Sequence, residues 1–241
     1  KDLPSTLIIN VIDTVASAAI SNNKGSYILI NDEGKVLNAD SKIVYVSAAE
    51  WDLKKAIANG GTVTLTEDII LESSCVISND VTINLNSKSI KCASSDVFVV
   101  TAGTLTINGN GLVYGSEDNS SSSCAVWAKE NGMVVINGGT YKVGHDGASK
   151  AANQANWRND CIYARDNAKI TINGGEFAYT GDINTENFQS DGNRFLLNCR
   201  DYDFKAGTSS ITVTGGIFHK FNPGATSSEN PVASYVAAGY S

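Results

Sequence analysis

The sequence contains few residues of the types on which metal centres depend, and its cysteines form no paired motif. Among 241 residues there are only 2 histidines and 5 cysteines, and no two cysteines stand in a CxxC arrangement. His145 and His219 lie far apart, and neither has a cysteine or histidine neighbour at metal-ligand spacing. A structural zinc site needs four such ligands close together, so the sequence argues against zinc.

Basic residues are also scarce. The chain has 18 Lys and Arg against 25 Asp and Glu, which gives a formal net charge of −7, and its pI is about 4.8. Binding to DNA or RNA requires a stripe of positive charge, and none is visible. The apolar stretch 7–20 is too short to span a bilayer and is interrupted by Asn10 and Asp13. We therefore expect neither a nucleic-acid partner nor a membrane partner.

The odd number of cysteines does not suit a framework made only of disulfides. Each cysteine lies in or beside an apolar run of the sequence. Free cysteine behaves as a small hydrophobic residue, and disulfides are rare in reducing compartments. We interpret the five as buried free thiols in a protein that folds in a reducing cytosol: Cys75, Cys92, Cys124, Cys161 and Cys199.

Glycine is abundant, with 22 residues against 3 prolines, and much of it belongs to a repeated motif. The motif reads MVVINGGTY at 133–141, KITINGGEF at 169–177 and SITVTGGIF at 210–218, with a looser copy, TLTINGNGLV, at 104–113. When the copies are aligned on their first apolar residue, that residue is Val63, Val81, Leu105, Val134, Ile170 and Ile211 in turn. Successive copies are 18, 24, 29, 36 and 41 residues apart. A constant core with lengthening insertions predicts a solenoid whose loops grow along its axis.

The two best copies show the repeating unit. Residues 125–141 align with residues 161–177 without a gap, and each copy contains three short segments that alternate apolar and polar residues. Alternation with period two predicts β-strands, and one such unit buries its apolar face only when copies stack. The glycine pair suits a tight corner that needs positive φ. We expect the residues before these glycines to form an internal ladder: Asn108, Asn137, Asn173 and Thr214.

Both ends of such a stack need a cap. Residues 47–59 are predicted to form a capping helix, with a capping box made by Ser47 and Glu50, and with Gly60 as its end. Its apolar face would consist of Trp51, Leu53 and Ile57. The tail, residues 218–241, would cover the far end of the stack.

Residues 1–46 differ from the repeats and are predicted to form a separate small element. The segment SYILINDEGKVLN at 26–38 alternates around Asp32, Glu33 and Gly34, which predicts a hairpin. We expect this element to attach the solenoid to another molecule or to serve in oligomerisation.

These features together resemble a known group of proteins. LKKAIANGGTVTLTEDIIL at 53–71, the later ITINGGEF-type units and the closing FNP and SYVAAGY segments resemble right-handed parallel β-helix proteins of gut bacteria and their phages. The resemblance covers residues 47–241. It implies an all-β fold, a right-handed single-stranded parallel β-helix. The fold is shared with phage tail fibres, tailspikes and head fibres, and with pectate lyases and polygalacturonases.

The resemblance implies a phage virion structural protein, a head or tail fibre or spike-like component used for adhesion to the host or for capsid decoration. Virion members of the group are typically homotrimers attached by an N-terminal segment. The expected partners are therefore two further copies, another virion protein bound through residues 1–46, and bacterial surface polysaccharide. A bacterial surface adhesin, secreted or held at the cell surface, is a further interpretation.

An enzyme is the alternative from a different class, namely a polysaccharide lyase or a glycoside hydrolase of the β-helix type. Glycoside hydrolysis needs two carboxylates at a controlled separation, and the paired-Asp and Arg-x-Lys motifs of polygalacturonases are missing. We expect long loops at residues 114–124, 142–160, 178–194 and 200–209. They carry these charged residues: His145, Asp146, Arg158, Asp160, Asp182, Glu186, Asp191, Arg194 and Asp201. We interpret these as solvated loop charges and predict no catalytic residue.

A calcium site was also considered. Asp182, Asn184 and Glu186 alternate in a way that could supply oxygen ligands to calcium. The central glycine and the closing bidentate glutamate of a calcium loop are absent, so we expect neither a metal nor another cofactor.

Two sets of side chains remain as candidates for binding. Aromatic residues in the expected loops would either stack on sugars or fasten the loops to the coil: Trp157, Phe188, Tyr202 and Phe204. Lys129 and Arg165 are expected to face outward on adjacent coils, with Glu130 and Asp166 beside them. This second set would form either a surface charge ladder or a contact between subunits.

Overall fold

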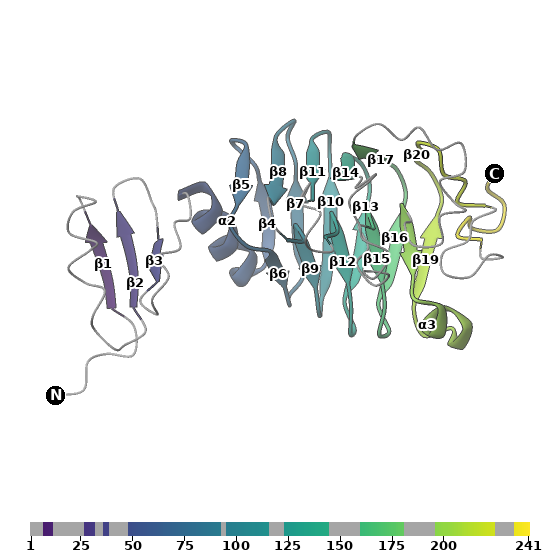
Figure 1. The fold of residues 1–241 in the computed structure, drawn as a ribbon, viewed down its shortest axis with the longest axis horizontal. Helices are drawn as coiled ribbons and strands as arrows, with labels where there is room; N and C mark the ends of the chain where they lie inside the picture. The colour runs from purple at the N-terminus through teal and green to yellow at the C-terminus, as the bar shows by residue number, and fades with distance from the viewer. Residues whose placement is uncertain are drawn as a thin grey trace, which may run out of the picture.

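The fold is mostly β, with three parallel sheets built from successive turns of the chain (Figure 1). The computed structural model describes residues 7–11, 27–31, 36–38, 48–92, 95–115, 123–144, 160–180, 196–224 and 234–241. From β4 onward, strands that follow one another in the chain belong to different sheets, and every third strand returns to the same sheet. This arrangement is the one expected of a parallel β-helix solenoid.

Each sheet contains one strand from each coil, except that the sixth coil adds no described strand to sheet III. Sheet I consists of β4 (Gly61–Thr64), β7 (Val81–Asn84), β10 (Thr104–Asn108), β13 (Met133–Ile136), β16 (Lys169–Ile172) and β19 (Ser210–Val213). Sheet II consists of β5 (Ile69–Leu71), β8 (Ser89–Cys92), β11 (Leu112–Tyr114), β14 (Thr140–Gly144), β17 (Glu176–Thr180) and β20 (Ile217–Phe218). Sheet III consists of β6 (Cys75–Ile77), β9 (Phe98–Val100), β12 (Val126–Ala128), β15 (Ile162–Ala164) and β18 (Leu197–Cys199).

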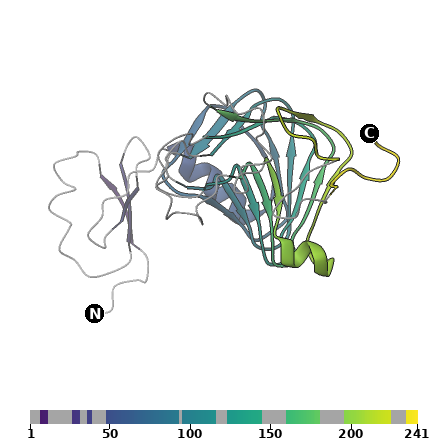
Figure 2. The same ribbon diagram turned by 45° about the vertical axis from the view of Figure 1, so that its right-hand side comes forward.

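The three sheets surround a common interior (Figure 2). Alternation within the strands places one set of side chains in this interior. In β16, Ile170 and Ile172 are buried, whereas Thr171 between them is only partly buried and points outward. The same pattern recurs in the paired strands on either side. One coil alone would expose this apolar side, so the stack is stable only as a column of coils. All five cysteines are buried thiols.

The predicted alignment of repeats is confirmed for five copies and wrong for the first. Four of the strand pairings are those read from the sequence: Val81–Leu105, Leu105–Val134, Val134–Ile170 and Ile170–Ile211. Val63, however, pairs with Ile83, not with Val81, which faces Gly61. Because strand side chains alternate with period two, a shift of two residues keeps the same face inward, so the sequence pattern does not distinguish the two registers.

Helix α2 (Ala48–Asn59) covers the N-terminal end of the stack and contacts β4, β5 and β6. Leu53 and Ile57 are buried against the first coil. The buried carboxylate of Glu50 accepts hydrogen bonds from the Glu72 backbone N–H, at 3.1 and 3.2 Å, and from Lys54 Nζ, at 2.6 Å. Glu50 therefore joins the helix to the first coil. Ser47, its predicted capping partner, lies outside the described residues.

The N-terminal region contains a three-stranded sheet of its own. β2 (Tyr27–Asn31) and β3 (Val36–Asn38) pair antiparallel, which confirms the predicted hairpin, although its turn lies outside the described residues. β1 (Leu7–Val11) pairs with β2 in parallel, an arrangement the sequence did not predict. Parallel strands need a long connection between them, so no short turn motif in the sequence indicates this pairing.

At the other end, the tail forms part of a seventh rung. Val236 pairs in parallel with Val213, and its neighbour Tyr235 is buried. The Tyr235 hydroxyl accepts a hydrogen bond from the Cys199 N–H at 3.1 Å. One residue further, Ala237 stands where the sixth coil has Thr214. The end of sheet I is thus covered by the chain itself.

Candidate functional site

The two predicted sugar-stacking residues that the structure describes lie on a helix. Residues 200–209 were predicted to be a loop, but Asp201–Ala206 form helix α3, which ends at Gly207 with a φ of 68°. Acidic residues in its first turn and a glycine just past its last turn favour a short helix there. Tyr202 is 75 % exposed, whereas Phe204 packs edge-on against Tyr235 with ring centroids 6.0 Å apart.

These two residues therefore differ in what they can bind. Phe204 fastens α3 to the tail, which is the second of the two roles predicted for the loop aromatics, and its ring is only partly exposed. Tyr202 alone of this pair projects into solvent. Trp157 and Phe188 lie outside the described residues.

The predicted ladder residues lie one above another at the end of sheet I. Each asparagine donates a hydrogen bond from its side-chain Nδ2 to the side chain of the asparagine on the preceding rung. Asn108 donates to Asn84 at 3.2 Å, Asn137 to Asn108 at 2.8 Å, and Asn173 to Asn137 at 2.9 Å. Thr214 Oγ1 donates to Asn173 Oδ1 at 2.8 Å. The row continues to Thr64, to which Asn84 donates at 3.1 Å.

The row lies on the surface, so the expectation of an internal ladder was wrong. Asn137 and Asn173 are exposed, and Asn108 and Thr214 are partly exposed. Each of these residues follows a buried strand residue, such as Ile107 before Asn108, and alternation therefore turns it outward. The row is an architectural feature that links the coils, with free hydrogen-bonding capacity on its outer side.

Sheet III carries an aromatic column on its outer face. Register pairs place Val76, Val99, Trp127, Tyr163 and Asn198 side by side on successive strands. The rings of Trp127 and Tyr163 are stacked, with centroids 6.4 Å apart and planes 19° from parallel. Val76 is 59 % exposed. Val99 and Asn198 are buried, and Trp127 and Tyr163 are partly buried, so only part of the column is open to solvent.

A cationic column runs beside the aromatic one, at the first position after each strand. It contains Lys129, Arg165 and Arg200, each donating its backbone N–H to the carbonyl at the end of the preceding strand in the sheet. Lys129 Nζ lies 4.7 Å from the centre of the Trp127 ring, a cation–π contact. Lys129 and Arg165 do lie on adjacent coils; Arg200 was not predicted, because the insertion before it hides the repeat.

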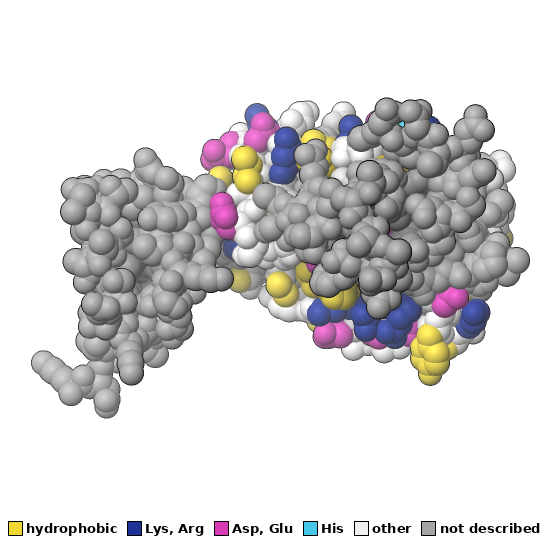
Figure 3. All heavy atoms as spheres, in the orientation of Figure 1, with side chains coloured by type: hydrophobic (Ala, Val, Ile, Leu, Met, Phe, Trp, Pro, Cys, Tyr) yellow, Lys and Arg dark blue, Asp and Glu magenta, His cyan; other side chains and the backbone are white. Residues whose placement is uncertain are grey.

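Acidic residues partly neutralise this column. Asp166 accepts a hydrogen bond from Arg165 Nε at 2.6 Å and also pairs with Arg200, whose Nε lies 2.6 Å from Asp203. Figure 3 shows Lys, Arg, Asp and Glu side chains close together on this part of the surface, near α3. The hydrogen bond to Asp203 raises the pKa of Arg200. The column thus forms a charge network in addition to the stacked rings.

Of the loop charges considered for catalysis, the structure describes only Asp160 and Asp201. Asp160 is buried and accepts a hydrogen bond from Asn198 Nδ2 at 2.8 Å, so its interpretation as a solvated loop charge was wrong. Asp201 begins α3 and lies 3.4 Å from Lys205 Nζ. The remaining loop charges and the calcium candidates lie outside the described residues. Within the described ranges, no group of three or more His, Cys, Asp or Glu residues is placed to hold a metal ion.

Two buried thiols, Cys124 just before β12 and Cys161 just before β15, are poor nucleophiles. Burial raises the pKa of the Cys124 thiol well above its ordinary value, and the nearby Asp96 and Asp160 carboxylates raise it further. Burial likewise raises the pKa of Cys161. Both thiols are therefore protonated at neutral pH, and thiolate chemistry is not available to them.

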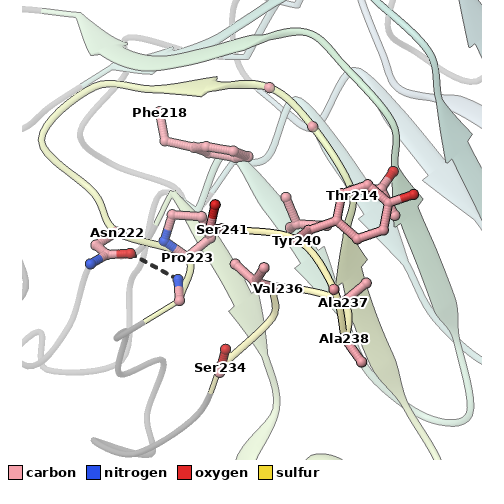
Figure 4. A pocket seen from close by; sticks show the side chains of 15 residues that line it. Thr214, Phe218, Asn222, Pro223, Ser234, Val236, Ala237, Ala238, Tyr240 and Ser241 are labelled. Atoms are coloured by element: carbon pink, nitrogen blue, oxygen red, sulfur yellow. Dashed lines mark hydrogen bonds between the residues drawn. The ribbon is translucent and has the colours of Figure 1, made fainter.

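A concave site lies at the C-terminal end of the stack (Figure 4). It has a volume of about 650 Å³ and lies between the last coil and the tail. In Figure 4 the ring of Phe218 lies at one side of this pocket and Pro223 and Val236 at the other. None of the side chains that line it is charged. We call it the end pocket.

Comparisons with known proteins add no family to this description. No protein-family model matches the chain, and no curated protein and no solved structure matches it significantly. Among the described residues, no helix is both long and apolar enough to cross a membrane.

Proposed function

We propose that the chain is a structural protein of a bacteriophage particle, a head or tail fibre or spike-like component displayed on its surface. The observation that carries this proposal is the stack itself: six coils whose strands pair in register along one axis. At about 4.8 Å per rung, six coils extend roughly 29 Å. Continuous pairing of this kind makes a stiff rod, which suits a part that must hold a binding surface away from a particle.

We further propose that the coils form a right-handed, single-stranded β-helix. Within each sheet the strand order follows the chain order, so one chain supplies every rung. Crossover connections between parallel strands of one sheet are right-handed in about 98 % of cases, which supports this handedness. Residues 1–46, with their own three-stranded sheet, would bind a neighbouring virion protein, and the solenoid would assemble as a homotrimer.

The outer face of sheet III is the surface we propose for adhesion. Tryptophan, tyrosine and arginine are the side chains that contribute most of the binding energy at protein interfaces. Trp127, Tyr163 and Arg165 provide these groups on neighbouring coils, and bacterial surface polysaccharide is the proposed ligand. If the surface instead contacts other virion proteins, the role would be capsid decoration.

Two measurements test the proposal. Light scattering of the purified chain should give a mass about three times 25.4 kDa. Particles purified by density gradient from a culture of the encoding strain should contain peptides of this chain. Peptides found only in the particle-free supernatant, or only in the cell envelope, would contradict a virion role and favour an enzyme or an adhesin. Cleavage of acidic polysaccharides by the chain would support the enzyme.

A further inference from the structure

The outer face of sheet II carries a line of side chains that runs along the axis of the solenoid. Register pairs place five residues side by side on successive strands: Ile70, Lys91, Tyr114, Lys142 and Ala178. Ile70 and Lys91 are exposed, and the other three are partly exposed. Figure 3 shows lysine or arginine side chains beside apolar ones along the upper edge of the solenoid, where sheet II lies in Figure 1. We call these five residues the sheet II row.

The ring of Tyr114 is held in one place on this row. Its hydroxyl lies 3.1 Å from Oγ1 of Thr180 on β17, and Thr180 in turn donates to the Val143 carbonyl at 3.3 Å. Since β14 lies between β11 and β17, the tyrosine side chain spans the strand between them. Lys91 Nζ lies 5.9 Å from the centre of the ring, within the range of a cation–π contact. A fixed aromatic ring of this kind provides a platform on which a flat ligand can stack.

The two lysines of the row are not neutralised by a bound carboxylate. Within the described ranges, neither Lys91 nor Lys142 forms an ion pair. Two acidic residues of the same region have other partners: Asp68, just before β5, accepts a backbone N–H at 2.7 Å, and Glu176 of β17 lies 2.7 Å from His219 Nε2. The row therefore presents two positive charges to solvent on a chain whose net charge is −7.

The spacing of these charges suits a linear polymer. Lys91 and Lys142 lie on either side of Tyr114 in the register of the sheet, so they are two rungs apart. Two rungs correspond to about 10 Å. One sugar unit of an extended polysaccharide is roughly as long as one rung. A chain of sugars lying along the row would therefore place one unit on the tyrosine ring and the units before and after it beside the two lysines.

The chemistry of the row favours an acidic polysaccharide over other anions. DNA carries one negative charge per about 1.7 Å of its axis, and a chain with a net charge of −7 repels so dense a polyanion. A stable protein interface buries about 800 Å² on each partner, which is more than one line of side chains offers. We propose that the sheet II row binds a polysaccharide with a carboxylate on every second sugar. The carboxylates lie against Lys91 and Lys142, and the sugar between them stacks on Tyr114.

This site is separate from the adhesion surface proposed above, because sheets II and III form different sides of the solenoid (Figure 2). It does not rest on the virion role either, since a fibre, an adhesin or an enzyme of acidic polysaccharide would each have a use for it. Failure of the row to bind leaves the test of the virion role unchanged, because that test measures the mass in solution and the composition of particles.

Hyaluronan, in which a carboxylate-bearing sugar alternates with a neutral one, is the probe. A fluorescently labelled hyaluronan decasaccharide should bind the full chain saturably in an anisotropy titration. Carboxyl-reduced hyaluronan of the same length should bind at least about fivefold more weakly, because it keeps the sugar faces but loses the charges. Added salt should weaken the binding of the charged polymer, since the contacts are exposed.

Substitutions in the row locate the binding. Lys91→Gln and Lys142→Gln should each weaken binding about fivefold, whereas Lys91→Arg, which keeps the charge, should retain it. Tyr114→Leu removes the ring but keeps an apolar side chain, and it should also weaken binding about fivefold. Lys169→Gln is the matched control: Lys169 is an exposed lysine on the outer face of sheet I, so its replacement makes the same change in net charge and should leave binding unchanged.

Equal affinity for the two polymers, or unchanged affinity of both glutamine variants of the row, would overturn the proposal. So would an equal loss in the Lys169→Gln variant, which would indicate attraction to the overall charge. Tighter binding of polyphosphate or of poly-glutamate than of hyaluronan would assign the row to a phosphate polymer or to an acidic protein segment instead. Circular dichroism spectra establish that each variant is folded before affinities are compared.

Discussion

At the scale of single residues, the coil corners leave almost no room for side chains. Gly103 has a φ of +65°, and a Cβ at this position would lie 2.4 Å from the carbonyl carbon of Asn79. The neighbouring rung is only about 4.8 Å away, so neither backbone can yield. Gly207, after α3, has nearly the same φ of +68°, but a Cβ there meets nothing within 4 Å.

Comparing alanine substitutions at Gly207 and Gly103 distinguishes the cost of a left-handed backbone from the cost of a steric clash. Gly207→Ala should lower the free energy of unfolding by about 1 to 2 kcal/mol, the cost of a left-handed backbone for a residue with a Cβ. Gly103→Ala should cost at least about 2 kcal/mol more, because the added methyl forces two coils apart. Urea unfolding followed by circular dichroism measures both. Equal losses would show that the coils can separate at this corner without cost.

At the scale of secondary-structure elements, short helices stabilise both ends of the solenoid. α2 holds the first coil through Glu50, and α3 holds the fifth coil through an arginine–aspartate network. In the second case Asp203 accepts a hydrogen bond from the Asp166 backbone N–H at 2.9 Å and pairs with Arg200. These polar contacts connect elements that the apolar core alone does not position.

The Asp203 network should make stability depend on pH in the acid range. Burial acts to raise the pKa of Asp203, but Arg200 and the Asp166 N–H outweigh it and hold the pKa below the ordinary 3.8. A lowered pKa stabilises the fold above about pH 3.8, and this contribution is lost as the pH falls through the folded-state pKa. Asp203→Asn should therefore cost about 2 kcal/mol at pH 7, and the difference from the parent chain should shrink below pH 4.

Urea titrations at pH 7 and at pH 3 measure this difference directly. Asp52→Asn provides a matched control, since Asp52 is an exposed aspartate on α2, and its replacement should change stability by less than about 0.5 kcal/mol. A loss at Asp203 that is the same at both pH values would contradict an electrostatic role and indicate a purely steric one.

At the scale of the whole molecule, stability accumulates along one axis. Within each sheet, a strand pairs only with the strands of the coil before it and the coil after it. The free energy of such a stack is approximately a sum over coils and their interfaces, so the coils at the ends are held by fewer contacts than the coils at the centre.

Hydrogen exchange should reveal this gradient. Amides of β10 and β13, which have a paired strand on both sides, should exchange slowest. Amides of β20, which pairs only with β17 among the described strands, should exchange fastest, followed by those of β19. Mass spectrometry of peptic fragments resolves these segments. Equal protection in all coils would mean that the solenoid opens only as one cooperative unit.

Much of the fold could be predicted because its determinants are local. Alternating residues such as Ile170 and Thr171 determine a strand and its buried face, and the glycine pairs determine the corners. The repeat of these signals is enough to imply stacking, since one coil cannot bury its own apolar side. The positions of Asn108, Asn137 and Asn173 above one another follow from the same alignment.

The candidate sites were harder to predict, because they depend on which coils become neighbours. Arg200 lies in the same column as Lys129 and Arg165. A long insertion precedes it in the sequence, so the alignment of repeats does not show that the three residues are equivalent. α3 forms where a loop was expected, because its packing of Phe204 on Tyr235 involves residues some 30 positions apart. The end pocket lies between the last coil and the tail, so its walls come from segments that are separated in the sequence.

The sequence by itself thus determined the strands, their inward faces, the corners and the need for caps, all of which follow from period-two alternation and from glycine conformation. Only the tertiary structure decided the register of the first coil, where Val63 faces Ile83, because a shift of two residues leaves the buried face unchanged. It also decided the outward position of the asparagine row, the neighbours of Trp127 and the pocket beside Phe218. These features depend on contacts between coils, which local sequence does not encode.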